Sequence, residues 1–190
     1  MTDQKRPKFW ETVPLKKMNQ TEWEALCDGC GKCCLNKIEY EDTGEIAYTR
    51  VACRLLDNET CRCAQYPIRH QFVPDCVRLS PKTLPKIAYW MPRTCAYRLL
   101  HEGKQLYPWH PLITGDPGSV HDAGASVQGW TIPEFEVNEE DWEDHIIEET
   151  SWCFSPLTTH PVQHPKLSPL SPAPTKVSRA ATVPITSWWR

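Results

Sequence analysis

The stretch Cys27-Asp28-Gly29-Cys30-Gly31-Lys32-Cys33-Cys34 places four thiols within eight residues, two of them adjacent. Apolar packing does not require this spacing, and thiolates gathered without a metal would repel one another and oxidise. A soft metal ion selects such clustered thiolates. The intervening glycines allow tight turns that direct successive sulfurs at one centre. The stretch therefore predicts a cysteine-ligated metal site around which the chain is organised.

The remaining cysteines extend this pattern along the first half of the chain. Nine of the ten cysteines lie between residues 27 and 95, and only Cys153 stands apart. The N-terminus leads into no apolar signal segment, and no apolar run is long enough to cross a membrane, so we expect a cytoplasmic protein without a membrane partner. Thiols stay reduced in that compartment, which favours metal over the alternative of a secreted, disulfide-linked domain.

Charge and composition change near residue 155. Residues 1–154 carry 17 Lys and Arg and all 24 Asp and Glu, whereas residues 155–190 carry four basic residues and no acidic one. An acidic main body argues against nucleic acid as a partner. The last segment is rich in Pro, Ser and Thr, which is typical of disorder. We therefore expect a polar lead-in over 1–18, a cysteine-cluster domain over 19–152 and a disordered tail over 153–190.

Helix signals are short and lie on both sides of the cysteines. Thr21 fits the N-cap of a short helix that leads into Cys27, with Glu24 completing a capping box. Thr94 can cap a second helix over 95–100, and an acidic helix is expected over about 139–149.

Strand signals are weaker than helix signals. Residues 38–51 alternate mildly and indicate a short strand, and prolines interrupt the segment between Cys63 and Cys76. Such a segment cannot build an ordinary core and needs cross-linking by bound metal. We predict a mainly α domain, a small α+β domain at most, with short helices and irregular, metal-stapled loops.

The predicted metal ligands are the nine clustered cysteines: Cys27, Cys30, Cys33, Cys34, Cys53, Cys61, Cys63, Cys76 and Cys95. Thiolate selects zinc, an iron–sulfur cluster or cuprous ion. The spacing C-x₂-C-x₂-C with a remote fourth cysteine also holds four-iron clusters, so zinc and iron both remain open. One tetrahedral ion uses only four thiolates; two sites, or one polynuclear site with bridging thiolates, would account for eight.

A few other side chains lie where they could assist the thiols. His70 is weighed as an additional ligand, whereas for His110 a packed loop histidine is the favoured interpretation. Asp28 is a candidate acceptor beside the thiols or a general base, and Arg62 and Arg78 are candidates for balancing thiolate charge.

The pattern Cys27-x₂-Cys30-Gly31-x-Cys33-Cys34, followed by Cys53, Cys63-x₂-Tyr66 and Cys76, resembles the zinc- or iron-chelating CxxCxxCC domain family. More narrowly, residues 8–152 are similar to the bacterial YcgN-like cysteine-cluster proteins, through segments such as Thr94–Leu100 and Trp109–Leu112. The resemblance implies eight family cysteines, to which Cys61 is an addition: Cys27, Cys30, Cys33, Cys34, Cys53, Cys63, Cys76 and Cys95. It implies no reaction.

Function is therefore expected at the level of metal binding. The first hypothesis is a cytoplasmic protein that binds zinc or iron and needs the metal to fold. The second is an iron–sulfur protein with a redox or catalytic role. The third is an adaptor that binds a protein partner through the aromatic loops around Trp90 and Trp109. The sequence contains neither a phosphate-binding glycine loop nor an H-E-x-x-H zinc helix, and whether the protein is an enzyme stays open.

Overall fold

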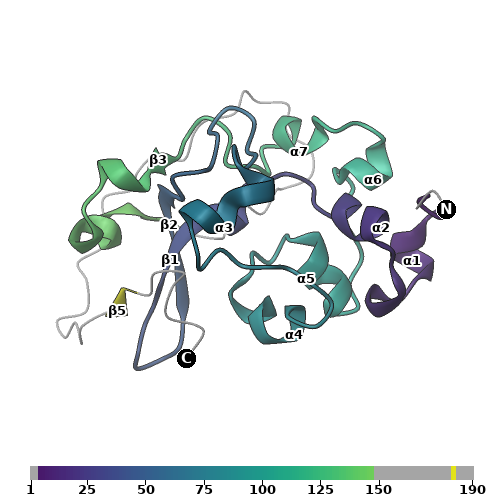
Figure 1. The fold of residues 1–190 in the computed structure, drawn as a ribbon, viewed down its shortest axis with the longest axis horizontal. Helices are drawn as coiled ribbons and strands as arrows, with labels where there is room; N and C mark the ends of the chain where they lie inside the picture. The colour runs from purple at the N-terminus through teal and green to yellow at the C-terminus, as the bar shows by residue number, and fades with distance from the viewer. Residues whose placement is uncertain (1–3, 148–180, 183–190) are drawn as a thin grey trace. The chain divides into compact units, whose positions relative to one another are not determined.

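A computed structural model describes residues 4–147 and 181–182 (Figure 1). The chain divides into two compact units. Unit 1 comprises Met1–Cys33 and Val77–Ser126, and unit 2 comprises Cys34–Cys76 and Val127–Arg190. The division therefore falls within the cysteine-rich segment, between the adjacent residues Cys33 and Cys34. Cys153 and the predicted tail, apart from residues 181–182, lie outside the described residues.

Unit 1 consists of short helices joined by turns. They are α1 (Phe9–Thr12), η1 (Leu15–Lys17), α2 (Gln20–Ala25), α4 (Leu84–Ile87), η4 (Ala88–Trp90), α5 (Ala96–His101), α6 (Pro111–Thr114) and α7 (Ser119–Asp122). Prolines explain part of this brevity, because proline lacks the N–H that a helix interior needs. Pro92 follows η4 closely, and Pro111 opens α6, the first position of a helix where proline is tolerated.

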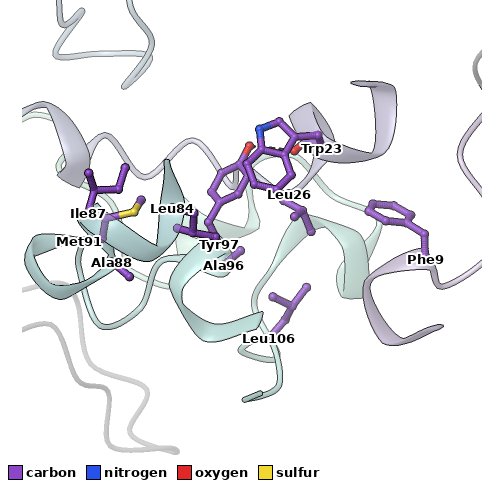
Figure 2. Close-up of a cluster of buried hydrophobic side chains, with 10 residues drawn as sticks. All are labelled: Phe9, Trp23, Leu26, Leu84, Ile87, Ala88, Met91, Ala96, Tyr97 and Leu106. Atoms are coloured by element: carbon purple, nitrogen blue, oxygen red, sulfur yellow. Dashed lines mark hydrogen bonds between the residues drawn. The ribbon is translucent and has the colours of Figure 1, made fainter. Parts of the chain in front are cut away.

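One apolar cluster holds these short helices together (Figure 2). Its buried members are Phe9, Trp23, Leu26, Leu84, Ile87, Ala88, Met91, Ala96, Tyr97 and Leu106. At its centre the rings of Trp23 and Tyr97 lie 4.8 Å apart, and the Tyr97 hydroxyl donates a 2.8 Å hydrogen bond to the Trp23 carbonyl. The cluster thus links α2, which delivers the chain to Cys27, with α5, which follows Cys95.

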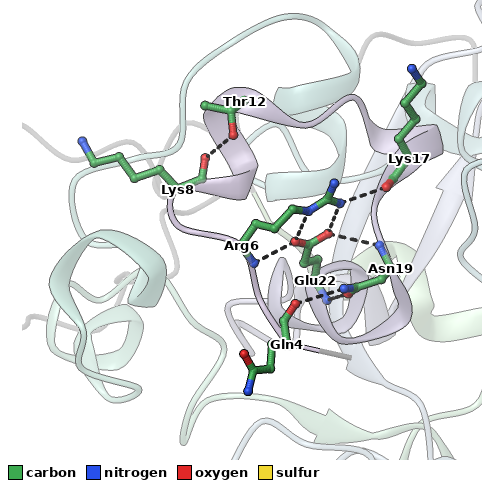
Figure 3. A network of polar contacts seen from close by, with 7 residues as sticks. All are labelled: Gln4, Arg6, Lys8, Thr12, Lys17, Asn19 and Glu22. Carbon is green, nitrogen blue, oxygen red and sulfur yellow. Dashed lines mark hydrogen bonds and ion pairs between the residues drawn. The ribbon is translucent and has the colours of Figure 1, made fainter. Parts of the chain in front are cut away.

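The N-terminus of α2 is stabilised by a polar network (Figure 3). Asn19, and not the predicted Thr21, is the N-cap: its side chain accepts from the Glu22 backbone N–H, and the Glu22 carboxylate accepts from the Asn19 backbone N–H. The predicted capping box therefore exists, but it begins two residues earlier. Glu22 is fully buried and also receives Arg6, so residues preceding α2 are built into unit 1.

Unit 2 is organised by a β-sheet. Strands β1 (Leu35–Glu39) and β2 (Ile46–Ala52) form an antiparallel hairpin. Two short strands pair with β2: β3 (Ile132–Pro133) runs parallel to it, and β4 (Ile146–Ile147) runs antiparallel. Strand β5 (Ala181–Thr182) pairs antiparallel with β1. The helical elements η3 (Tyr66–Ile68), α3 (Arg69–Phe72), η5 (Glu134–Glu136) and η6 (Glu139–His145) complete the described part of the unit.

Both faces of this sheet are covered. Tyr48 and Ala52 contribute to one buried cluster, together with Leu35, Cys61 and Val127. Val51 points to the other face, as expected from the two-residue period of a strand, and packs there with Ile38 and Trp142. The sheet is therefore the core of unit 2. It fixes the backbone directly after Cys34, where β1 begins, and directly before Cys53, where β2 ends.

The predicted mainly α class is wrong, because the fold combines a β-sheet with many short helices. The expected short strand over 38–51 instead contains the turn and parts of both strands of a hairpin, since Gly44 adopts a left-handed φ of 66° that allows the chain to reverse. The predicted acidic helix over 139–149 is present in part: η6 is a 3-10 helix over Glu139–His145, after which the chain extends into β4.

Candidate metal centre

The Cys27–Cys34 segment adopts the tight turns that its glycines predict. Gly29 and Gly31 both have left-handed backbone conformations, with φ values of 79° and 74°. Such φ values are costly for residues with a Cβ atom, so the cysteines can alternate with these turns only because glycine occupies both positions. The segment then enters η2 (Lys32–Cys34), a single 3-10 turn that contains the adjacent cysteines.

In unit 1 the thiols of this segment lie near Cys95. Burial raises the pKa of the Cys30 thiol well above its usual value; the charge of Asp28 raises it further, Lys32 opposes the increase, and Cys33 and Cys95 add to it. Charges influence one another over roughly 10 Å at moderate ionic strength. Cys30, Cys33 and Cys95 therefore lie within electrostatic reach of one another in the unit.

The pKa of the Cys95 thiol is also affected by Cys27, the first cysteine of the motif. Burial is the main cause that raises the pKa of the Cys95 thiol, and the backbone N–H of Arg98 acts against it. The charges of Asp28, Cys33 and Cys27 raise this pKa further. Cys95 is the N-cap of α5. The prediction had placed the cap one residue earlier, at Thr94, and Cys95 in the first turn of the helix. Four thiols of unit 1 thus belong to one electrostatic neighbourhood.

Two buried charged residues accompany these thiols. Asp28 Oδ1 accepts a 3.0 Å hydrogen bond from the Cys30 backbone N–H, which closes the turn around Gly29. Its other oxygen, Oδ2, is buried and has no hydrogen-bond partner among the described residues. Lys32 is only 1% exposed, and its Nζ donates a 3.2 Å hydrogen bond to Thr94 Oγ1. The neighbourhood therefore contains a cation beside the groups that become thiolates.

Lys32 is a functional candidate that the sequence did not reveal. A lysine between two cysteines is ordinarily exposed, and only its position inside the C-x₂-C spacing hints at a role. The residues considered for charge balance, Arg62 and Arg78, are both exposed. Asp28, which was considered as an acceptor beside the thiols, does lie there.

His110 serves the loop rather than offering a ligand. Its Nδ1 accepts from the Leu112 backbone N–H at 3.1 Å, so Nε2 carries the proton and donates to the Leu26 carbonyl at 3.1 Å. Burial lowers the pKa of His110, although the Leu26 carbonyl and Asp28 favour protonation. Both ring nitrogens are engaged, and the contact fixes the residue that precedes Cys27. Neighbouring Trp109 packs against the small apolar cluster that contains Cys30.

In unit 2 a second group of cysteines surrounds the end of β2. The Cys53 backbone N–H donates to the Cys34 carbonyl at 2.9 Å, which continues the β1–β2 ladder past its last pair. Cys63 forms an isolated β-bridge with Leu56 and so returns to the segment that follows Cys53. Burial raises the pKa of Cys53 to about 11, against a hydrogen bond from the Leu55 backbone N–H, and the charges of Glu134, Cys76 and Cys63 contribute.

Two other ligand candidates of unit 2 lie in different surroundings. Cys61 is 4% exposed and packs in the apolar cluster with Tyr48 and Val127, at a left-handed φ of 54°. His70 is on α3, with its Nδ1 3.4 Å from the Pro74 carbonyl oxygen.

The cysteine thiols are the type of ligand that a soft metal prefers, but their side chains do not converge on one point. No disulfide joins the nine described cysteines. As the side chains stand, no three Cys, His, Asp or Glu side chains within residues 4–147 and 181–182 could hold a metal ion between them. Thiols whose pKa is raised by burial hold their protons until a cation replaces them, and thiolate is the ligand that zinc and iron–sulfur centres share.

No helix in the described part of the chain is long and apolar enough to cross a membrane.

Comparison with known proteins places the chain among bacterial relatives. It is 68% identical over 149 residues to a UPF0260 protein of Rhodobacter capsulatus, covering 78% of this chain and 99% of the relative. It is 58% identical over 140 residues to a UPF0260 protein of Rhizorhabdus wittichii, covering 74% and 94%. A UPF0260 protein of Allorhizobium ampelinum is 55% identical over 140 residues, covering 74% and 87%. No solved structure matches the chain.

A domain family also matches the cysteine-rich segment. Residues 26–96 match the CxxCxxCC family, described as "Putative zinc- or iron-chelating domain". The match includes the Cys27–Cys34 segment and ends just after Cys95, so it contains every cysteine whose surroundings are described above. With relatives this similar over their whole length, the chain belongs to the UPF0260 family and carries the CxxCxxCC domain of that family.

Proposed function

We propose that this protein binds zinc or iron through cysteine thiolates and that the bound metal stabilises the loop-rich residues 27–95. The observation that carries this proposal is the group of reduced thiols around Cys30 and Cys95. Both thiols are desolvated, each lies within electrostatic reach of two or more other cysteines, and a buried lysine accompanies them. A soft cation binds such thiols as thiolates by replacing their protons, and its positive charge stabilises the thiolates that burial alone disfavours.

The metal requirement follows from the architecture. The helices and strands between Cys27 and Cys95 are short, and turns occupy most of this range. Short segments of this kind bury little apolar surface of their own, so a metal cross-link contributes a large share of their folding free energy. The cysteines lie in the same units, but their side chains do not point at a common centre. Metal coordination therefore requires the thiol side chains and their loops to move toward the ion.

Metal analysis of the full chain tests the proposal. The protein is purified anaerobically from metal-replete cells, and zinc, iron and labile sulfide are measured per chain. Stoichiometric zinc or iron, together with unfolding by a strong chelator, is the expected result. A metal-free protein that remains folded, with thiols that do not take up zinc or iron, contradicts it. A cytoplasmic location belongs to the same proposal, because reduced thiols persist there.

An iron–sulfur centre with a redox role is a second candidate. The spacing of Cys27, Cys30 and Cys33, joined in unit 1 by the remote Cys95, is the arrangement that bacterial ferredoxins use for a four-iron cluster. When bound, such a cluster supplies one-electron chemistry. A brown anaerobic preparation with labile sulfide and oxygen-sensitive absorption supports this candidate, whereas colourless protein with zinc alone excludes it.

A further inference from the structure

The adjacent residues Cys33 and Cys34 end one unit and begin the other. The same division separates the other family cysteines into two equal sets. Unit 1 contains Cys27, Cys30, Cys33 and Cys95, and unit 2 contains Cys34, Cys53, Cys63 and Cys76. Each set has the number of thiolates that one tetrahedral metal site uses.

We propose that these eight cysteines form two separate four-thiolate metal sites, one in each unit, so that the neighbours Cys33 and Cys34 serve different metals. This inference rests on the proposed function and goes beyond it, because cysteine-based metal binding is equally compatible with one polynuclear site that shares all eight thiolates.

The unit 1 set is assembled by contacts that bring distant parts of the chain together. The hydrogen bond from Lys32 to Thr94 joins the loop between Cys30 and Cys33 to the residue before Cys95. The hydrogen bond from His110 to Leu26 fixes the residue before Cys27. The apolar cluster holds α2 against α5, which flank Cys27 and Cys95 respectively. All these contacts lie within unit 1, and none requires unit 2.

The unit 2 set is assembled by β-structure. The Cys53 backbone N–H donates to the Cys34 carbonyl next to the end pair of the β1–β2 hairpin, Leu35 with Ala52, so the backbones of the two cysteines lie side by side there. The bridge between Leu56 and Cys63, supported by the hydrogen bond from the Ala64 N–H to the Leu55 carbonyl, returns Cys63 to this end. Cys76, the fourth cysteine of the set, is the last residue of the Cys34–Cys76 segment of the same unit.

Cys61 is left out of both sites. It belongs to unit 2, but its side chain packs among apolar residues of the sheet, where it behaves as a small buried hydrophobe. It therefore offers a matched control: a cysteine of the same segment, two residues from a proposed ligand, whose replacement should preserve metal content.

The first test uses the unaltered full chain and zinc alone. Metal-free protein is reduced anaerobically, supplied with zero, one or two equivalents of zinc, and treated with a thiol-alkylating reagent whose adducts are mapped by mass spectrometry. Saturation at two zinc ions per chain is expected. At one equivalent, protection should rise together within each set of four cysteines, whichever set fills first.

The second test separates the neighbouring cysteines. Cys33→Ser and Cys34→Ser should each retain one zinc per chain, and Cys61→Ala should retain two. Hydrogen exchange identifies the site that was lost: Cys33→Ser should weaken protection of α5 and spare β2, whereas Cys34→Ser should do the reverse. Because alkylation mapping needs no substitution, the division into sites is also tested where a variant fails to fold.

Each other outcome has a defined meaning. Saturation at one zinc, protection of all eight cysteines in a single step, or loss of all zinc from both variants would overturn the two-site division while leaving thiolate metal binding intact. Persistent binding of two zinc ions by Cys33→Ser or Cys34→Ser also overturns it. Failure of the unaltered chain to bind zinc or iron rejects the proposed function itself.

Discussion

Lys32 Nζ donates a 3.2 Å hydrogen bond to Thr94 Oγ1, and both residues are buried beside cysteines that are far apart in the sequence. An ammonium group is seldom removed from water without a compensating negative charge. Here Asp28 supplies a carboxylate that acts on the same thiol, Cys30, and the proposed metal binding would add thiolates. Lys32 thus has two effects in unit 1: its hydrogen bond holds the Cys30–Cys33 loop to the residue before Cys95, and its charge favours the Cys30 thiolate.

Replacing Lys32 with methionine should weaken zinc binding by unit 1. Methionine retains an unbranched apolar side chain but removes the charge that favours the Cys30 thiolate. Changes next to metal ligands typically lower affinity by about 10–100-fold. Competition with a chromophoric chelator measures the change in the full chain. Lys86→Met, on the exposed side of α4, is the matched control and should bind zinc like the unaltered protein. Equal affinities for both variants would remove Lys32 from the site.

Substitution of His110 by alanine distinguishes a packing histidine from a metal ligand. The change removes the donor to the buried Leu26 carbonyl, and an unsatisfied buried polar group costs about 1–3 kcal/mol. We expect the free energy of unfolding in urea to fall by this amount while zinc per chain stays unchanged. His101→Ala, at an exposed position, should alter neither quantity. A loss of stoichiometric zinc on His110→Ala would show instead that this histidine coordinates metal.

The turns of the candidate site could be predicted from sequence, because a glycine between closely spaced cysteines indicates a backbone conformation that other residues rarely adopt. Gly29 and Gly31 alternate with cysteines, and both have the left-handed conformation that such turns require. The helix after Cys95 was also predictable, to within a residue, from a polar cap followed by apolar residues. In both cases the signal lies in contiguous sequence.

The features that escaped prediction depend on distant contacts. Strands β3 and β4 have two residues each and become strands only because β2 offers its edge, so no periodicity can reveal them. The burial of Lys32 depends on Thr94, 62 residues later. The boundary between the two units, which falls between Cys33 and Cys34, cannot be recognised in the sequence either, because the two cysteines are adjacent.

Glu22 should make stability sensitive to acid. Hydrogen bonds from the Arg6 side chain lower the pKa of Glu22 to about 2, against a usual value of 4.5; burial opposes this, and backbone N–H groups of Arg6 and Asn19 contribute to the decrease (Figure 3). A carboxylate whose pKa is lowered in the folded state stabilises that state above its unfolded pKa. This stabilisation is complete above about pH 4.5 and is lost as the pH falls toward 2.

The variant Glu22→Gln therefore should differ most from the unaltered protein near neutral pH and least near pH 2. Thermal denaturation of both proteins, prepared with the same metal content, at several pH values measures the difference. The subtraction cancels any loss of metal in acid and the contribution of Glu102, whose pKa is also lowered to about 2. Glu11→Gln, exposed on α1, should give no pH-dependent difference. A constant difference across this range would mean that the Arg6–Glu22 pair does not control acid stability.

Phe9 tests whether the residues before α2 belong to the folded unit. The sequence suggested a polar lead-in over 1–18. Within that range the Phe9 side chain is only 1% exposed and packs in the main apolar cluster of unit 1 (Figure 2). Its ring lies 5.4 Å from that of Trp10. Replacing a fully buried phenylalanine with alanine typically costs about 3–5 kcal/mol, because apolar burial is lost and a cavity remains. Urea denaturation of Phe9→Ala should show a loss of this size. Thr12→Ala, at an exposed position of the same short helix, should change stability by only about 0.5 kcal/mol. Similar small effects for both variants would show that α1 contributes nothing to the stability of unit 1 and that the folded unit begins at α2.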